Sequence, residues 1–221
     1  MSIEIKELYK IKESEYEAVY QMLLEAFAKY PKLQVAFPDE KTRMVAIEMV
    51  LRFYGQYDLT YGAGFSLDEN LNEAVFMMHS DYVGFSDEMA RAAGCYSEVF
   101  QSLASRLSKE DVARWEGVFE ELDQKEAALN LPKPYLYLDF VAVRRNLQGE
   151  GRGSRLIQAV CSYAREQGLP VMLFTNGEED VAFYKKNGFR IVGVTRSETY
   201  GFENTYMWYE DGRTINRANR R

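Results

Sequence analysis

The chain is poor in the residues that metal centres and disulfide frameworks require. Its 221 residues include a single histidine, His79, and two cysteines, Cys95 and Cys161. Two cysteines are too few for a disulfide framework, and their separation is not that of a metal-ligand pair. We therefore expect no metal site and no disulfide framework.

Long apolar runs and a surplus of positive charge are absent from the sequence as well. No segment approaches the ~20 apolar residues of a membrane span, and the N-terminal region has no apolar run of signal-peptide length. We therefore expect no membrane partner and a cytoplasmic location. The net charge of −7 argues against nucleic acid as the main partner, because binding to the phosphate backbone requires clustered positive charge.

Size and composition favour one large folded domain. With 47% hydrophobic residues, the chain can bury a sizeable core. No repeat or low-complexity linker divides it, so we expect a single domain over residues 1–221. Residues 211–221 form a short basic tail, for which we expect a solvated position. A homodimer is the default expectation, since dimers are the commonest oligomers.

Residues 148–153, Gln-Gly-Glu-Gly-Arg-Gly, are the most informative segment of the chain. The run 135–143 before them is typical of a strand, and the run through Gln167 has apolar residues at helical spacing. Glycines let the backbone turn tightly, and the first free N–H groups of a following helix point at a bound anion. The segment therefore predicts a phosphate cradle.

Two known glycine motifs do not fit this segment. A P-loop ends in Gly-Lys-Ser/Thr, and that triplet is missing here. A dinucleotide fingerprint that started at Gly149 would need Gly or Ala where Ser154 stands, and an acidic residue about 20 positions on. Phe174 and Thr175 occupy those later positions. A nucleotide-binding oxidoreductase is therefore disfavoured.

The arrangement resembles the GNAT superfamily of N-acetyltransferases, whose cofactor loop reads Gln/Arg-x-x-Gly-x-Gly/Ala between a strand and a helix. Gln148, Gly151 and Gly153 match that loop. Further on, residues 181–189, Val-Ala-Phe-Tyr-Lys-Lys-Asn-Gly-Phe, resemble the family's Phe-Tyr-x-x-x-Gly-Phe segment. The resemblance covers residues 135–209.

The resemblance implies acetyl-CoA as cosubstrate, held by the loop and by a wedge between two diverging strands. Glu150 departs from the Lys or Arg that is common in the loop, and Asp180 stands where an asparagine often contacts pantetheine. Backbone N–H groups near Val141 or Ala142 are expected to polarise the thioester carbonyl. The expected coenzyme contacts are Val141, Ala142, Val143, Gln148, Gly149, Glu150, Gly151, Arg152, Gly153, Ser154, Asp180 and Tyr184.

Acyl transfer to an amine also requires a proton donor for the departing thiolate and a base for the amine. The resemblance assigns the donor role to Tyr184. Some family members carry a glutamate where Tyr137 stands, and Asp139, two residues on, shares that strand face. Asp139 is the leading candidate for the base, with Tyr137, His79 and a water relay as alternatives. A role for Asp139 in substrate binding alone stays open.

The predicted fold is α/β (α+β): a GNAT-like mixed, mostly antiparallel central sheet flanked by helices. Residues Ile3–Leu8 indicate a first strand, and Ser14–Glu17 a capping box that opens a helix. A second helix follows Asp39, and strands are expected at Thr60–Phe65 and Leu71–Met78. After the cofactor helix we expect a parallel strand at 170–174, a short helix with Tyr184, and a final antiparallel pair at 191–194 and 205–209.

A helical insertion over about 81–132 is expected before the cofactor strand. Ser108 indicates the cap of its longest helix. Trp115 and Phe119 are interpreted as core residues, because aromatic stripes at helical spacing usually bury. Tyr96 and Glu98 remain candidates for lining the acceptor side of the cleft.

Taken together, these patterns predict an N-acetyltransferase that passes an acetyl group directly from acetyl-CoA to a small-molecule or peptide amine in a ternary complex. Cys161 falls within the predicted cofactor helix, which disfavours a covalent cysteine intermediate. The alternative is a non-catalytic acyl-CoA-binding or sensor module, which would keep the loop and lack a working base.

Overall fold

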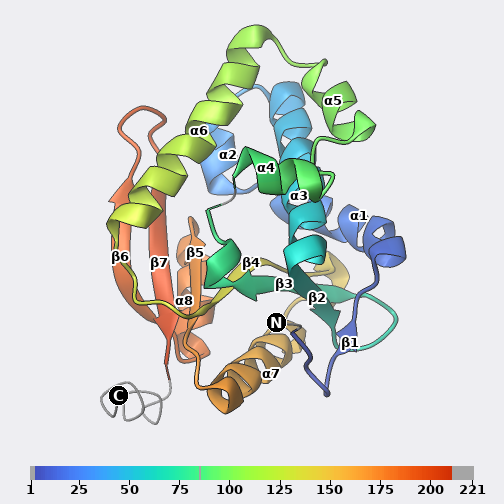
Figure 1. The fold of residues 1–221 in the computed structure, drawn as a ribbon, viewed down its shortest axis with the longest axis vertical. Coiled ribbons are helices and arrows are strands. Elements are labelled where there is room, and N and C mark those ends of the chain that lie inside the picture. The colour runs from blue at the N-terminus through green and yellow to red at the C-terminus, as the bar shows by residue number, and fades with distance from the viewer. Residues whose placement is uncertain (1–2, 85, 211–221) are drawn as a thin grey trace.

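The computed structural model describes residues 3–84 and 86–210, so the predicted basic tail at 211–221 lies outside the described residues. Within them, one seven-stranded sheet with the order β1-β2-β3-β4-β5-β7-β6 is flanked by helices (Figure 1). The strands are β1 Tyr9–Lys10, β2 Gly62–Ser66, β3 Glu73–His79, β4 Leu136–Val143, β5 Val171–Thr175, β6 Arg190–Arg196 and β7 Glu203–Tyr209. The helices are α1 Tyr16–Phe27, α2 Pro31–Ala36, α3 Glu40–Tyr61, α4 Asp87–Ala92, α5 Glu98–Ala104, α6 Lys109–Ala128, α7 Arg152–Gln167 and α8 Glu178–Lys186.

The sheet is mixed, which confirms the predicted fold class. The pair β4–β5 is parallel, and the other neighbouring pairs are antiparallel. A parallel pair requires a crossover connection, and α7 supplies it between β4 and β5. The loop at 148–153 therefore lies where β4 passes into the crossover helix.

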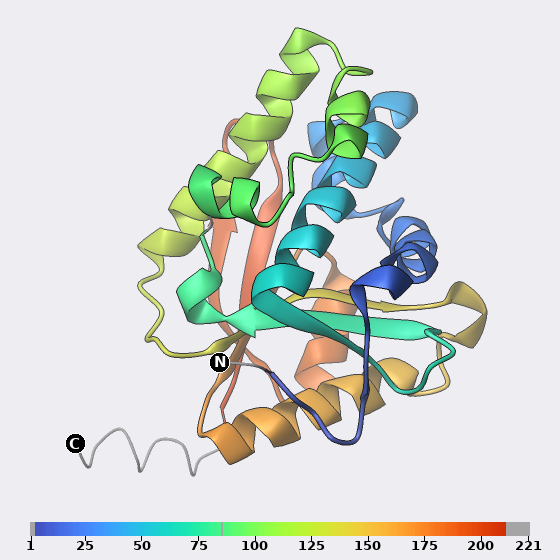
Figure 2. The same cartoon turned by 45° about the vertical axis from the view of Figure 1, so that its right-hand side comes forward.

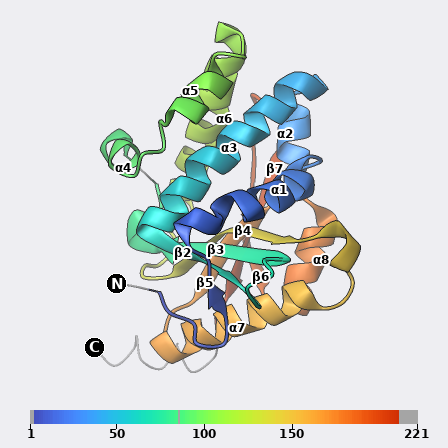
Figure 3. The same cartoon turned by 90° about the vertical axis from the view of Figure 1, so that its right-hand side faces the viewer.

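Helices cover both faces of the sheet and divide the core in two. Figure 3 shows α1 and α3 on one side of the strands and α7 on the other, and Figure 2 shows α7 running beneath the sheet, away from α3. The core on the α3 side includes Phe53, Tyr137 and Phe140. The core on the α7 side includes Leu138 and Ile157. Each face of β4 thus contributes to a different core.

The first predicted strand and the first predicted helix cap are wrong. Residues 3–8 form turn and irregular backbone, and only Tyr9–Lys10 pairs with β2. Ile3, Ile5 and Leu8 are buried all the same, so their alternation reflects packing against the α7-side core without strand pairing. Before α1, Glu15 rather than Ser14 is the N-cap residue, and its carboxylate accepts from the N–H of Lys12 at 2.9 Å.

The second half of the chain follows the sequence pattern more closely. Ser108 caps α6 by accepting from the N–H of Asp111 at 3.0 Å, as its sequence predicts. Three helices, α4 to α6, connect β3 to β4, in agreement with a helical region at 81–132. Helix α2 was not predicted, and α3 runs to Tyr61, so β2 starts at Gly62 instead of the predicted Thr60.

A β-bulge interrupts β4 in the middle. Val141 pairs with Val75 and Leu138 with Met77, so Asp139 and Phe140 together stand opposite one residue of β3. Such an extra residue re-aims the side chains of the bulged strand. As a result, Asp139 and its neighbour Phe140 both line the same cavity on the α3 side of the sheet.

No helix in the described part of the chain combines the length and the apolar character that crossing a membrane would require.

Candidate active site

The loop before α7 leaves the first N–H groups of that helix free of side-chain partners. Gly151 is the N-cap residue, and among the described residues no side chain caps this end of α7. The first turn of α7 contains no acidic residue. Free amides and the positive end of the helix dipole together attract anions. The segment has the geometry of a phosphate cradle.

Two glycines shape the cradle through their backbone conformation. Gly149 has φ +85° and Gly151 has φ +78°, the left-handed region that L side chains rarely adopt. A Cβ at either position would meet no protein atom within 4 Å, so both face open space. Gly153 differs, because a Cβ there would lie 3.3 Å from Phe183 and 3.5 Å from Val143. Gly153 therefore allows close packing of α7 against α8 and β4.

Two polar side chains of the loop point back into the protein. Gln148 donates to the carbonyl of Val143 at 3.1 Å and so fixes the turn between β4 and α7. Arg152 donates to the fully buried carboxylate of Glu73 and lies 3.4 Å from Asp68. The side chain of Arg152 therefore secures the helix start to β3. Its backbone N–H is the group that remains for a ligand.

The two GNAT-like segments touch each other in the structure. The side-chain amide of Asn187, at the end of α8, lies 3.3 Å from the hydroxyl of Ser154 in the first turn of α7. Asn187 also donates to the carbonyl of Phe183 at 2.9 Å. The start of the cofactor helix is thereby joined to the segment that carries Tyr184.

A wedge opens between β4 and β5 next to this contact. The two strands pair only at Leu136 with Val171 and at Tyr137 with Met172. Beyond these pairs, the edge of β4 that faces β5 has no strand partner in the described residues. Exposed strand edges bind amide-bearing chains through main-chain hydrogen bonds. The wedge predicted between diverging strands is present, and Val141, Ala142 and Val143 lie on its β4 side.

Tyr184 and Asp180 approach the wedge from α8. The ring of Tyr184 packs against those of Phe183 and Phe189, at centroid distances of 5.1 and 5.5 Å. Burial, followed by the nearby Asp180, raises the pKa of Tyr184 above its usual value, so the phenol keeps its proton. Asp180 is exposed and accepts from the hydroxyl of Thr175 at 2.9 Å.

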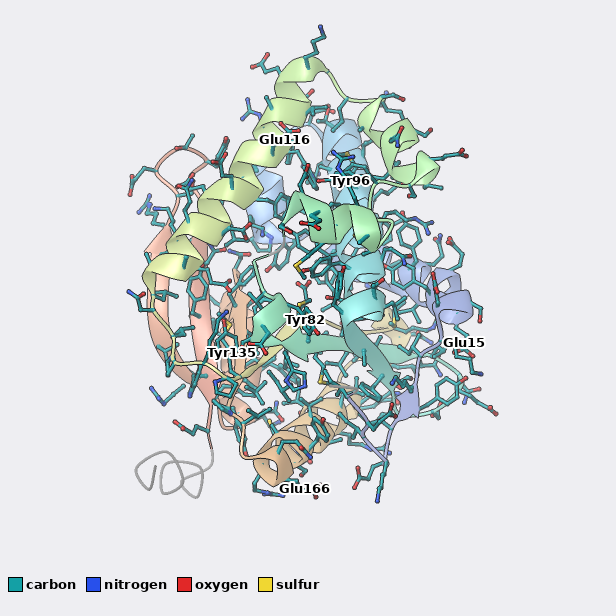
Figure 4. All side chains as sticks on the ribbon, viewed as in Figure 1. Glu15, Tyr82, Tyr96, Glu116, Tyr135 and Glu166 are labelled. Carbon is teal, nitrogen blue, oxygen red and sulfur yellow. The ribbon has the colours of Figure 1, made fainter. Side chains whose placement is uncertain are left out.

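A cavity of about 80 Å³ lies on the α3 side of the sheet, and we call it the inner cavity. It shares Asp123 and Glu126 with a more open outer cavity of about 310 Å³. Figure 4 labels Tyr82, which lines the inner cavity, and Tyr135, which lines the outer one. The lining residues of the inner cavity that matter for its chemistry are Tyr30, Lys32, Asp123, Glu126, Tyr137, Asp139 and Phe174.

Asp139 has the electrostatic properties of a base that works near neutral pH. Burial raises its pKa to about 7, although the ammonium of Lys32 acts in the opposite direction. Glu126 behaves similarly, because burial and the nearby Asp123 raise its pKa to about 8. A carboxylate with a pKa close to the working pH accepts protons efficiently in general-base catalysis.

Tyr137 and His79, the two side-chain alternatives to Asp139 as the base, lie on different sides of the sheet. Tyr137 lines the inner cavity together with Asp139, and burial raises its pKa well above the usual value. His79 lies on the same strand face as Met77, which belongs to the core on the α7 side. His79 is thus on the other side of the sheet from Asp139.

The helical region contributes to the cavity through residues other than those expected. Tyr96 and Glu98 do not line the inner cavity. The hydroxyl of Tyr96 donates to Asp87 at 2.7 Å. Trp115 is buried core, as expected, whereas Phe119 is buried and also lines the cavity.

The sequence reasoning missed Lys32 and Glu126. Pro31 at the first position of α2 is a recognised helix-start signal that would have indicated the helix bearing Lys32. Nothing in the sequence marks Glu126 among the many acidic residues of α6. No group of three or more metal-ligating side chains occurs in the residues that the structure describes.

The cradle follows β4, the wedge lies between β4 and β5, and residues of both strands line the inner cavity. The free amides of α7 suit a pyrophosphate, and the unpaired edge of β4 suits the amide-bearing arm of coenzyme A. The inner cavity lies beyond, with a carboxylate of neutral pKa. This combination of fold and site suits acyl transfer from coenzyme A.

Comparisons with known proteins match part of the chain to a family and most of it to known folds. Residues 110–189 match the model of the acetyltransferase (GNAT) family. No curated protein matches the chain. An agmatine N-acetyltransferase structure matches 91% of this chain and 97% of its own, with 15% identity and a TM-score of 0.61. A structure from Corynebacterium glutamicum, described as histone acetyltransferase HPA2 and related acetyltransferase, matches over 93% and 96%, with 16% identity and a TM-score of 0.55.

A third structure matches only in part. A protein from Agrobacterium tumefaciens matches over 35% of this chain and 57% of its own, with 20% identity and a TM-score of 0.32. The two matches over nearly the whole chain establish the fold. The family model adds a match to GNAT acetyltransferases over residues 110–189, about a third of the chain. The family match begins inside α6, and the interpretation of 81–132 as an insertion stays a prediction.

Proposed function

We propose that the protein transfers an acetyl group from acetyl-CoA to a primary amine by direct attack in a ternary complex. The observation that carries this proposal is the pairing of β4 with β5, which stops at Tyr137 and Met172. This end of the pairing lies on β4 between the loop that leads into α7 and the residues of β4 that line the inner cavity. The amides of residues 149–154 hold the pyrophosphate, and the free edge of β4 holds the pantetheine arm.

The proposed chemistry uses two groups of β4 and one group of α8. Asp139 takes a proton from the amine, and a backbone N–H near Val141 or Ala142 stabilises the oxyanion. Such a preorganised donor contributes ~2.7–4 kcal/mol in other acyl-transfer enzymes. Tyr184 protonates the departing thiolate, a step for which its raised pKa keeps the proton available.

The acceptor reacts directly, without an acyl-cysteine intermediate. Burial raises the pKa of Cys95 to about 11 and that of Cys161 to about 12. The thiolate is the nucleophilic form of cysteine, and both side chains are held as inert thiols near neutral pH. Three carboxylates and one lysine around the inner cavity favour an amine that arrives as a cation.

The test is acceptor-dependent release of coenzyme A. Acetyl-CoA is supplied with a panel of agmatine, polyamines, aminoglycosides and peptides with free amino groups, and each rate is corrected for thioester hydrolysis without acceptor. We expect turnover with at least one amine and a rate that rises with pH through about 7, as Asp139 loses its proton. Binding of acetyl-CoA without turnover across the whole panel would instead support a non-catalytic acyl-CoA-binding module.

A further inference from the structure

Lys32 is an unusual lysine because it is almost completely buried. Its exposed fraction is 3%, whereas lysine side chains are rarely buried unless they are paired. The structure gives Lys32 no ion pair within the described residues. Its Nζ lies 4.8 Å from the ring centre of Phe119, 5.0 Å from that of Phe174 and 5.9 Å from that of Tyr30. Three aromatic rings therefore surround this amine at the inner cavity.

The surroundings of Lys32 favour a neutral, reactive amine. Burial lowers its pKa to about 8, although Asp139, Asp123 and Glu126 act in the opposite direction. At pH 8 about half of such a group carries no proton, compared with well under about 1% for a lysine with its usual pKa. Only the unprotonated amine attacks a thioester. Lys32 thus meets the chemical requirement for an acceptor.

The position of Lys32 also fits that of an acceptor. Phe174, one of the rings around its Nζ, lies on β5 two residues beyond Met172, the last residue that pairs with β4. Tyr30, another of these rings, lies near Asp180 and Tyr184. Both groups add to the effect of burial in raising the pKa of Tyr30. The amine therefore lies near the proposed base, and one of the rings around it lies near the proposed proton donor.

We propose that Lys32 is a self-acetylation site, modified by the acetyl-CoA that the same chain binds. The neutral Nζ attacks the thioester carbon, so the C–N bond forms and the C–S bond breaks. The amine proton passes to Asp139, and the departing thiolate takes the proton of Tyr184. The products are Nε-acetyl-Lys32 and coenzyme A, and the proton on Asp139 is available to restore Tyr184.

This inference rests on the proposed acetyl-CoA site and has a consequence for the acceptor. Lys32 is the one basic residue among the described residues that line the inner cavity. Acetylation converts its ammonium into a neutral amide and adds bulk to a cavity of about 80 Å³. Modified chains are therefore expected to turn over external amines more slowly, and a good external amine should protect Lys32.

The experiment measures acetyl incorporation in the whole chain. The purified protein is incubated with acetyl-CoA, followed by intact mass measurement and peptide mapping. We expect one acetyl group on Lys32, a first-order rate that does not depend on protein concentration, and a rate at pH 8.5 at least about ten-fold above that at pH 6.5. Lys32→Arg should abolish the mass increase of one acetyl group. Lys29→Arg, at an exposed lysine on the same segment, should not.

The outcomes separate this inference from the proposed function. Acetylation that spreads over exposed lysines and omits Lys32, or that continues at the same rate in unfolded protein, overturns the self-acetylation proposal. If Lys32 stays unmodified while external amines are acetylated, only the self-acetylation proposal fails. If acetyl-CoA binds and neither Lys32 nor any external amine is acetylated, both proposals fail. Slower acetylation of Lys32 in Asp139→Asn, with folding intact, would support Asp139 as the base in both proposals.

Discussion

Asp139→Asn is expected to lower kcat/KM for the amine acceptor by about 10²–10⁴-fold, the usual contribution of a positioned base. Asparagine has nearly the same shape and cannot accept the amine proton. The affinity for acetyl-CoA should not change, because the proposed coenzyme contacts are backbone groups of the loop and of β4. Steady-state kinetics across pH would also show the loss of the rise through about 7 that ionisation of Asp139 produces in the parent protein.

The same substitution should make the protein more stable at neutral pH. The pKa of Asp139 rises from 3.8 to about 7 on folding, so the folded state binds more protons than the unfolded state between these values. Stability therefore falls as pH rises through this window, and Asp139→Asn removes that loss. We expect a gain of ~1 kcal/mol or more at pH 8, equivalent to about 2–4 °C in Tm, and little difference below about pH 4.

A matched control is available on the outer part of α6. Glu116 is exposed and labelled in Figure 4, so Glu116→Gln makes the same carboxylate-to-amide change away from the cavity. It should leave both kcat/KM and Tm unchanged. Lower activity in Asp139→Asn that comes with a lower Tm would assign the loss to misfolding and contradict the role of Asp139 as base.

Tyr184→Phe is expected to lower kcat by about 10²–10⁴-fold with little change in the affinity for acetyl-CoA. The phenylalanine ring keeps the packing against Phe183 and Phe189, so the variant removes only the proton donor. Because the pKa of Tyr184 is raised, the parent enzyme should show no loss of rate from this residue up to about pH 10.

The control for this variant is Tyr163→Phe on α7. Tyr163 is partly buried against the core on the α7 side and lies outside the inner cavity. Single-turnover measurements with a saturating acceptor would separate the chemical step from product release. If Tyr184→Phe retains the parental kcat, as Tyr163→Phe should, the thiolate takes its proton from another source.

The second half of the fold was predictable because its signals are local. The strand at 136–143, the helix at 152–167 and the final strand pair each have a clear period and clear ends, and the glycines of the loop take the left-handed backbone that the cradle requires. At the N-terminus the signals were misleading. Ile3, Ile5 and Leu8 alternate like a strand and are buried, yet of this N-terminal segment only Tyr9 and Lys10 pair with β2.

The candidate site was predictable only where one motif carries it. The cradle and Tyr184 follow from two short segments, and Asp139 followed from its place on the cofactor strand. The inner cavity brings together α2, α3, α6, β4 and β5, which are distant in sequence, so no local pattern places Lys32 and Glu126 at this cavity. The bulge that turns both Asp139 and Phe140 toward this cavity is a property of strand pairing, which the residue pattern does not reveal.

Calorimetric titration of coenzyme A into the protein and two glycine variants tests the central claim most directly. Gly151 and Gly94 have nearly the same left-handed backbone, with φ +78° and +77°, and a Cβ at either would meet no protein atom within 4 Å. Alanine at each should cost a similar ~1–2 kcal/mol of stability. We predict that the parent protein and Gly94→Ala bind coenzyme A equally and that Gly151→Ala binds at least about ten-fold more weakly, a loss of ~1.4 kcal/mol. Equal affinity in all three proteins, or no binding to the parent, would contradict the assignment of the α7 amides as the coenzyme site.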